Sequence, residues 1–275
     1  MKRSLKTILR PYFTMRREMS KKAHIVFSLL SVLTMIGVYS LVAYGSSSHV
    51  LPTWGQMWEG LQKIIWDPFF EESYLWDDSI ASFSRLFPAI GIASVIGIVI
   101  GMYMGVYASA QSYFGIFLLL IGNIPANSIM VAIMIYLGNG FLMYIGIIVF
   151  GTMAIIAKGT FLGVKAISDE HVFSLKTLDA SSTEIVWTVL LREVLPNIIE
   201  AILQAIGLGL IYLIATEWVV GSEGFGYRFM MFQRSARMEL IFPYVIYLGL
   251  VGIAIGLLGG LIKRLICRGH VKEAS

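Results

Sequence analysis

Two ionisable residues lie within or at the ends of long apolar runs, and their surroundings decide what chemistry they can do. Lys158 lies in one such run, and Glu217 lies near the end of a later one. If these runs cross a membrane, a charge in them is costly unless it is paired, hydrated or able to reach the interface. We expect the Lys158 side chain to extend towards the interface, and we do not assign it to a site. Glu217 is expected to pair with a basic residue such as Arg228 or Arg234.

The chain after Glu217 combines glycines, charges and aromatic residues. Gly224 and Gly226 permit sharp backbone turns, and the residues at 229–232 are too apolar for a solvated tail. A short helix that dips back towards the membrane fits this pattern. The segment either caps a path through the membrane, with Glu217, Gly224 and Gly226 as its site residues, or is a structural connector.

Polar residues also interrupt an earlier apolar stretch, where Asn123 and Asn127 flank Pro125. Backbone groups freed by a break at membrane depth are tolerated where protein or a water-filled cavity meets them. These three residues either line a path or form a packed kink whose amides bond neighbouring helices.

No residue pattern indicates catalysis or metal binding. All four histidines lie outside the interiors of the apolar runs, and neither H-E-x-x-H nor G-x-S-x-G occurs. A G-x-x-x-x-G-K-[ST] phosphate loop is also absent, so the chain does not hydrolyse ATP by that route. We expect no catalytic residue, no metal site and no cofactor bound by this chain.

Composition shows which elements must position these residues. The 275 residues are 57% hydrophobic and 14% charged, with a mean hydropathy of +0.78, well outside the range of soluble domains. A spanning helix needs about 20 apolar residues. The sequence predicts an all-α membrane protein with six transmembrane helices, at about 24–44, 86–107, two within 113–164, 197–220 and 241–262. Gly97, Gly101 and Gly105, and likewise Gly252, Gly256 and Gly260, are predicted helix-packing seams.

Charge predicts the orientation. Basic residues precede the first span and follow the last, whereas residues 46–84 contain one lysine against six carboxylates. By the positive-inside rule both the N and C termini are cytoplasmic. We expect a basic cytoplasmic segment at 1–23, a transmembrane domain at 24–264 with outer loops at 46–84 and 221–240, and a cytoplasmic tail at 265–275. The basic flanks are suited to lipid, and we expect no nucleic acid partner.

The cytoplasmic loop at 165–195 is too long for a simple connector. Its apolar residues recur at helical spacing among polar ones, which predicts two short helices around a turn at 179–183. Pro196 is easily accommodated at the first position of the following span.

At this loop the sequence resembles the permeases of ATP-binding-cassette importers, in particular the nitrate/sulfonate/taurine branch. Thr177-Leu178, Ala180-Ser181 and Leu195-Pro196 agree with the cytoplasmic signature of that family, although its E-A-A positions and its glycine differ here. Further agreement lies at Leu51-Pro52-Thr53, Ser82 to Arg85, Ile124-Pro125, Thr216-Glu217 and Gly224-Phe225-Gly226-Tyr227, in consistent order.

The resemblance implies a type I importer permease of the MetI-like fold in the bacterial inner membrane. It implies a path for a small, anionic solute, a separate ATPase that uses ATP and Mg²⁺, an extracytoplasmic binding protein, and a second permease copy in a homodimer or heterodimer. The residues expected to contact the ATPase are Leu175, Lys176, Thr177, Leu178, Asp179, Ala180 and Ser181. An ion-coupled secondary transporter is the alternative, followed by an embedded enzyme.

Overall fold

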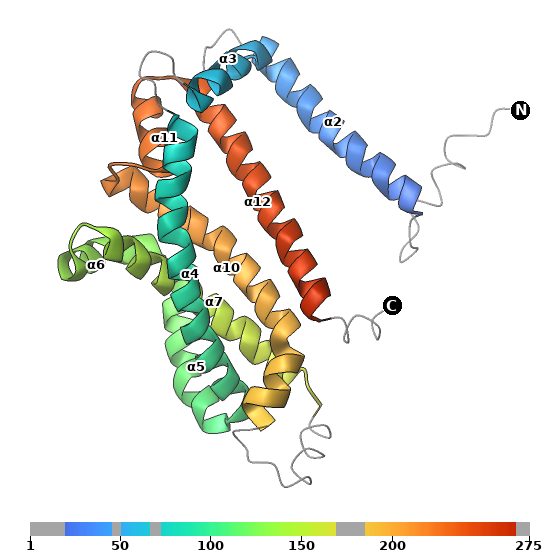
Figure 1. The fold of residues 1–275 in the computed structure, drawn as a ribbon, viewed down its shortest axis with the longest axis vertical. Helices are drawn as coiled ribbons and strands as arrows, with labels where there is room; N and C mark the ends of the chain where they lie inside the picture. The colour runs from blue at the N-terminus through green and yellow to red at the C-terminus, as the bar shows by residue number, and fades with distance from the viewer. Residues whose placement is uncertain (1–19, 46–50, 67–72, 169–184, 268–275) are drawn as a thin grey trace, which may run out of the picture. The chain divides into compact units, whose positions relative to one another are not determined.

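The computed structural model describes residues 20–45, 51–66, 73–168 and 185–267, and every regular element in these ranges is a helix. Five helices are long and apolar enough to cross a membrane, and a bent pair of helices is a sixth candidate. The prediction of an all-α membrane protein with six spans is confirmed in this form (Figure 1). The chain divides into two compact units, Met1–Trp58 and Glu59–Ser275.

The first unit holds α2 (Lys21–Gly45) and the start of α3 (Trp54–Ile65). The Tyr39 hydroxyl donates to the carbonyl oxygen of Pro52 at 2.6 Å, and the Trp54 indole N–H donates to Ser40 Oγ at 2.9 Å. The rings of Tyr39 and Trp54 also meet edge to face, with centroids 5.0 Å apart. These contacts fasten the start of α3 to the end of α2.

The core of the second unit consists of α4 (Tyr74–Val106), α7 (Phe141–Lys165) and α10 (Leu191–Val220). Helices α4 and α7 approach closely because glycines lie between them. A Cβ atom at Gly97 would lie 2.8 Å from Ile156 Cβ, and one at Gly101 would lie 2.6 Å from Thr160 Cβ. This confirms the first predicted packing seam. Helix α4 begins at Tyr74 rather than near Leu86, so the end of the expected loop at 46–84 is helical.

The second predicted seam is not a contact seam among the described residues of the second unit. A Cβ atom at Gly252, Gly256 or Gly260 of α12 (Met238–Ile266) would meet nothing within 4 Å, whereas Gly259 packs against Leu203 of α10. Spacing alone does not show which side of a glycine-rich helix faces a neighbour.

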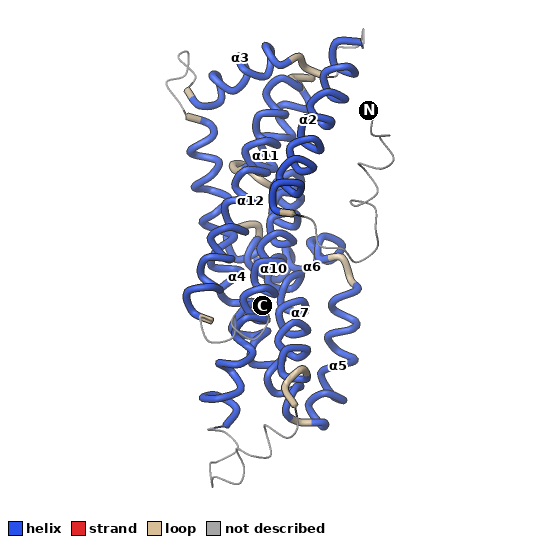
Figure 2. Tube along the Cα trace, turned by 90° about the vertical axis from the view of Figure 1, so that its right-hand side faces the viewer, coloured by secondary structure: helices blue, strands red, loops and turns tan. Residues whose placement is uncertain are grey.

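The third span is broken. Helix α5 (Ala108–Asn123) is followed by a short 3-10 helix, η2 (Ala126–Ile129), and by α6 (Met130–Leu137), with a bend of 86°. Pro125 lies at the break with φ −59° and ψ 123°, and it has no N–H to continue the helical hydrogen bonds. Helix α5 lies beside α4 and α7, and α6 runs in a different direction after the bend but still packs on α7 (Figure 1, Figure 2). The predicted interruption at Pro125 is confirmed.

The fifth span starts earlier than expected. A π-helical turn, η3 (Ile185–Leu190), runs directly into α10, and Pro196 lies inside α10 rather than at its first position. Val186 and Leu190 are buried against Met102 and Val164, so this end of the span packs on α4 and α7. The helix therefore starts before Pro196, because the apolar residues that precede the proline are buried against α4 and α7.

Candidate functional site: a buried ion-pair cluster

Glu217 is the most deeply buried carboxylate in the described part of the chain, with no exposed surface. It lies in the last turn of α10. Its Oε1 accepts from Arg85 Nη1 at 2.8 Å and from Ser82 Oγ at 2.9 Å, and its Oε2 accepts from the Gly226 N–H at 3.0 Å. Each oxygen therefore has a donor, which offsets the cost of removing the charge from water.

Arg85 of α4 is the basic partner of Glu217, and the prediction of Arg228 or Arg234 was wrong. Only 7% of Arg85 is exposed. Its guanidinium also donates to the side chain and the carbonyl oxygen of Glu223, and it stacks over the ring of Tyr144 with 4.4 Å to the centroid. Arg85 thus joins α4 to α7, α10 and the loop before α11.

A second ion pair lies about two turns earlier on the same face of α4. Asp78, only 1% exposed, accepts from Arg228 Nε at 2.8 Å and from the Tyr244 hydroxyl at 2.7 Å. Burial lowers the pKa of Arg228, but the hydrogen bonds and charge of Asp78 outweigh it, so the pKa is raised overall. Arg228 stays positively charged, and Asp78 joins α4 to α11 and α12.

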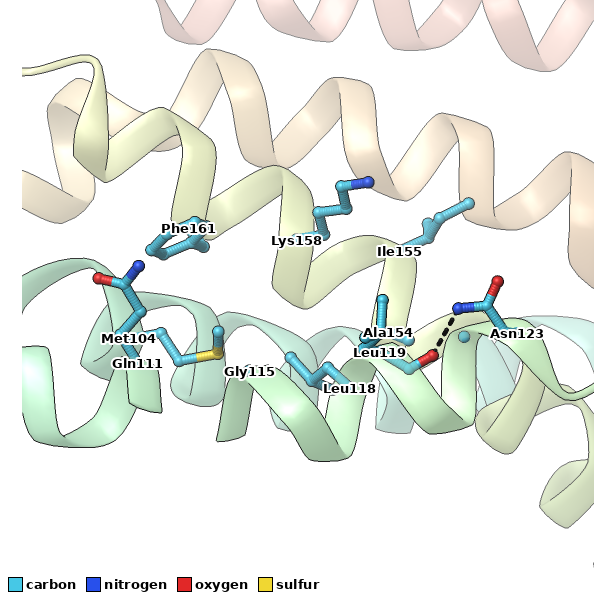
Figure 3. Close-up of a pocket in the computed structure, with 11 residues that line it drawn as sticks. Met104, Gln111, Gly115, Leu118, Leu119, Asn123, Ala154, Ile155, Lys158 and Phe161 are labelled. Atoms are coloured by element: carbon cyan, nitrogen blue, oxygen red, sulfur yellow. Dashed lines mark hydrogen bonds between the residues drawn. The ribbon is translucent and has the colours of Figure 1, made fainter. Parts of the chain in front are cut away.

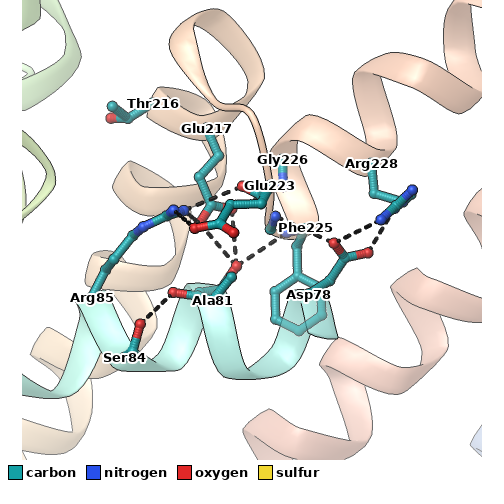
Figure 4. Close-up of polar contacts among 12 residues, drawn as sticks. Asp78, Ala81, Ser84, Arg85, Thr216, Glu217, Glu223, Phe225, Gly226 and Arg228 are labelled. Atoms are coloured by element: carbon teal, nitrogen blue, oxygen red, sulfur yellow. Dashed lines mark hydrogen bonds and ion pairs between the residues drawn. The ribbon is translucent and has the colours of Figure 1, made fainter. Parts of the chain in front are cut away.

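Helix α11 (Phe225–Arg234) is held by these groups. The N–H groups of its first turn and of the residue before it have no partner within the helix. Those of Gly224, Phe225 and Gly226 donate to Asp78, Ser82 and Glu217. Figure 4 shows Asp78 of α4 and Glu217 of α10 beside the start of α11. The predicted short helix after Glu217 is confirmed.

The glycines are required by close approach. Gly224 has φ +99°, a conformation that favours glycine. A Cβ atom there would collide with the Glu217 carboxylate, and one at Gly226 would lie 2.7 Å from the Glu217 Cβ and closer still to the carbonyl oxygen of Ile214. The structure therefore brings together three of the predicted site residues, Glu217, Gly224 and Gly226.

We call the set of Asp78, Ser82, Arg85, Glu217, Glu223 and Arg228 the ion-pair cluster. Asp78, Ser82 and Arg85 were not among the predicted site residues, and Asp78 was predicted only as an acidic residue of an outer loop. Asp78, Ser82 and Arg85 follow the spacing i, i+4, i+7, which places them on one face of a helix. That spacing is the signal that could have found them.

The other predicted path residues lie elsewhere. Asn123 donates to the carbonyl oxygen of Leu119 in its own helix and lines a groove of about 440 Å³ between α5 and α7, together with Lys158 (Figure 3). Asn127 lies in η2, which packs on α7 and α10, and its Oδ1 is buried without a hydrogen-bond partner among the described residues. Pro125 forms the break between them.

The seven residues predicted to contact an ATPase, Leu175 to Ser181, lie outside the described residues. Their role therefore stays a prediction. The described residues that follow, from Ile185, enter the packed end of α10.

The fold defines the class of protein. The chain matches a solved structure of the MetNI methionine ABC transporter in an inward facing conformation, with a TM-score of 0.62 and 18% identity, over 67% of this chain and 92% of that one. Residues 93–269 match the family described as binding-protein-dependent transport system inner membrane component. The chain belongs to this family, and it is a multi-pass protein of the inner membrane.

Two relatives narrow the assignment. The chain is 26% identical over 227 residues to the taurine transport system permease protein TauC of Escherichia coli, which covers 82% of this chain and 79% of TauC. It is 22% identical over 232 residues to the nitrate import permease protein NrtB of Synechocystis, with 82% of each chain covered. The resemblance to the nitrate/sulfonate/taurine branch is confirmed, and these homologues are transport permeases rather than enzymes.

Proposed function

We propose that this chain and a second permease copy form the translocation path of an importer for a small anionic solute. The membership of residues 93–269 in the binding-protein-dependent family carries this proposal. The names of the taurine and nitrate relatives support an anionic group on the solute. The chain itself is non-catalytic and binds no cofactor. A separate ATP-binding-cassette ATPase uses ATP and Mg²⁺, and an extracytoplasmic binding protein delivers the solute.

The proposed orientation places both termini in the cytoplasm. The basic residues at the two ends of the chain support it, as does the acidic stretch at 46–84. The ion-pair cluster then lies at the outer end of the path, and Leu175 to Ser181 lie on the cytoplasmic side, where they contact the ATPase.

We assign α11 as a cap at the outer end of the path. It is short, it follows a glycine turn, and buried charges rather than apolar contacts alone hold its first turn on α4 and α10. The buried rings of Phe225, Phe229 and Phe232 also pack against Tyr244 of α12. When the polar contacts to α4 and α10 are released, α11 therefore moves together with this end of α12. The binding protein contacts this end and biases that movement.

The test is reconstitution of the chain with its ATPase and binding protein in lipid vesicles. Uptake of labelled solute should require ATP, the ATPase and the binding protein together. The isolated chain should show no flux. Strong flux through the isolated chain, driven by a proton or sodium gradient, would instead indicate an ion-coupled secondary transporter.

A further inference from the structure

The groove between α5 and α7 is lined by two helical faces. Gln111, Gly115, Gly122 and Asn123 lie on one face of α5, and Ala154, Lys158 and Phe161 lie on the facing side of α7. Its volume of about 440 Å³ is in the range of small-molecule sites. A Cβ atom at Gly115 would meet nothing within 4 Å, so this position opens onto free space in the groove.

Lys158 supplies the positive charge in this groove. The other ten residues that line it are apolar or neutral. In the described part of the chain no carboxylate pairs with Lys158, whereas the buried or half-buried cations Arg85, Arg228 and Lys263 each have an acidic partner. Lys158 is exposed, and Gln111 and Asn123 lie at opposite ends of the same groove (Figure 3).

The position of Lys158 along α7 argues for a role in the groove. Gly97 and Gly101 of α4 pack against Ile156 and Thr160, so Lys158 is level with the middle of a continuous packed region. It lies seven residues before the end of α7 at Lys165, about 10 Å along the axis. A cation at such a depth is costly unless water or an opposite charge reaches it.

We propose that this groove is a hydrated site in the translocation path, where Lys158 binds the anionic group of the solute and the amides of Gln111 and Asn123 solvate it. The inference rests on the proposed function, and it assigns the selectivity of the path for anions to Lys158. Both a soluble anion and an acidic lipid headgroup carry a small anionic group that could bind here. We propose that the ligand is the soluble anion.

The test measures the electric field in the groove without a known substrate. In a Cys267→Ser background, Gly115→Cys places a reporter thiol in the groove, and Ser84→Cys places a control thiol on an exposed site of α4. Ser84 precedes Gly97 by 13 residues, about 20 Å along the helix, beyond the Debye length at physiological salt. Each thiol is treated with an anionic sulfonatoethyl and a cationic trimethylammonioethyl methanethiosulfonate, in the full-length permease assembled with its ATPase.

The readout is a ratio of two modification rates at the Gly115→Cys thiol: the rate with the anionic reagent divided by the rate with the cationic reagent. Lys158→Gln should lower this ratio roughly fivefold or more, because removal of one nearby unit charge affects the two reagents in opposite directions. Lys158→Arg should preserve it, and the Ser84→Cys ratio should not change. An unreactive Gly115→Cys thiol, or a ratio indifferent to Lys158→Gln, would show that Lys158 extends to the interface or faces lipid, and would overturn the proposal.

Two further arms separate the alternatives. The modification rates are measured in vesicles of phosphatidylcholine alone or mixed with phosphatidylglycerol, and the Ser84→Cys rates are used to correct for the surface charge of the vesicles. The preference of the Gly115→Cys thiol for the anionic reagent should be the same in both lipids. Its loss with phosphatidylglycerol would assign the groove to a lipid headgroup and refute the soluble anion. ATP-driven uptake by the wild-type complex tests the proposed function separately, because a complex without uptake contradicts that function while the thiol rates still report the field in the groove.

Discussion

The Glu217–Arg85 ion pair should be the largest single polar contribution to the stability of the second unit. The perturbation is Glu217→Gln, which keeps the shape of the side chain and removes its charge. Arg85 and Gly226 donate to different oxygens of Glu217, so whichever oxygen becomes the amide nitrogen will face an N–H donor. Arg85, 7% exposed, then keeps only Glu223 as an acidic partner, and that side chain is 61% exposed.

The magnitude follows from burial. Loss of one partner from a buried ion pair costs about 3–5 kcal/mol, because the remaining charge is left without compensation. The matched control is Glu200→Gln, which removes the acidic partner of Lys263. That pair is exposed, with 55% of the Glu200 side chain and 33% of the Lys263 side chain accessible. Pairs of this kind contribute about 0–1 kcal/mol.

The assay is equilibrium unfolding of the purified chain in mixed micelles with increasing dodecyl sulfate, followed by circular dichroism. Glu217→Gln should lower the free energy of unfolding by at least about 2 kcal/mol more than Glu200→Gln does. A double-mutant cycle with Arg85→Met should show a coupling energy of about 1–3 kcal/mol. Equal effects of the two Gln variants, or a coupling energy near zero, would refute the argument that the ion-pair cluster holds α11.

Three further predictions follow from the same contacts and from the sequence. Gly226→Ala should destabilise the protein by about 1–3 kcal/mol through overpacking against the backbone of α10, measured by equilibrium unfolding. The control Gly249→Ala, at an open position of α12, should be neutral or stabilising by up to about 1 kcal/mol. Leu178→Arg should abolish solute-stimulated ATPase activity and uptake in the assembled importer while membrane insertion, checked by blotting, is normal; unchanged uptake would remove this loop from coupling. The purified chain alone should release no phosphate from ATP, since it has no phosphate loop, and measurable hydrolysis that purifies with the chain would contradict this.

The sequence by itself determined the class of the protein and most of its elements. The length and apolarity of the runs predict the spans, because a backbone in hydrocarbon must bond within its own helix. The missing N–H of Pro125 predicts the break in the third span, and the glycines after Glu217 predict the turn before α11. Each of these features depends only on residues close together in the sequence, so a single segment is enough to predict it.

Only the tertiary structure decided which groups meet. Arg85 is far from Glu217 in the sequence and yet pairs with it at 2.8 Å, while the nearby Arg228 pairs with Asp78. The packing of α4 against α10 and α11 selects these partners, and no local pattern reports which helices become neighbours. The same holds for Lys158, whose place in a groove depends on α5 lying beside α7. Ion pairs and cavities are properties of helices in contact, so their chemistry emerges only when the spans are packed together.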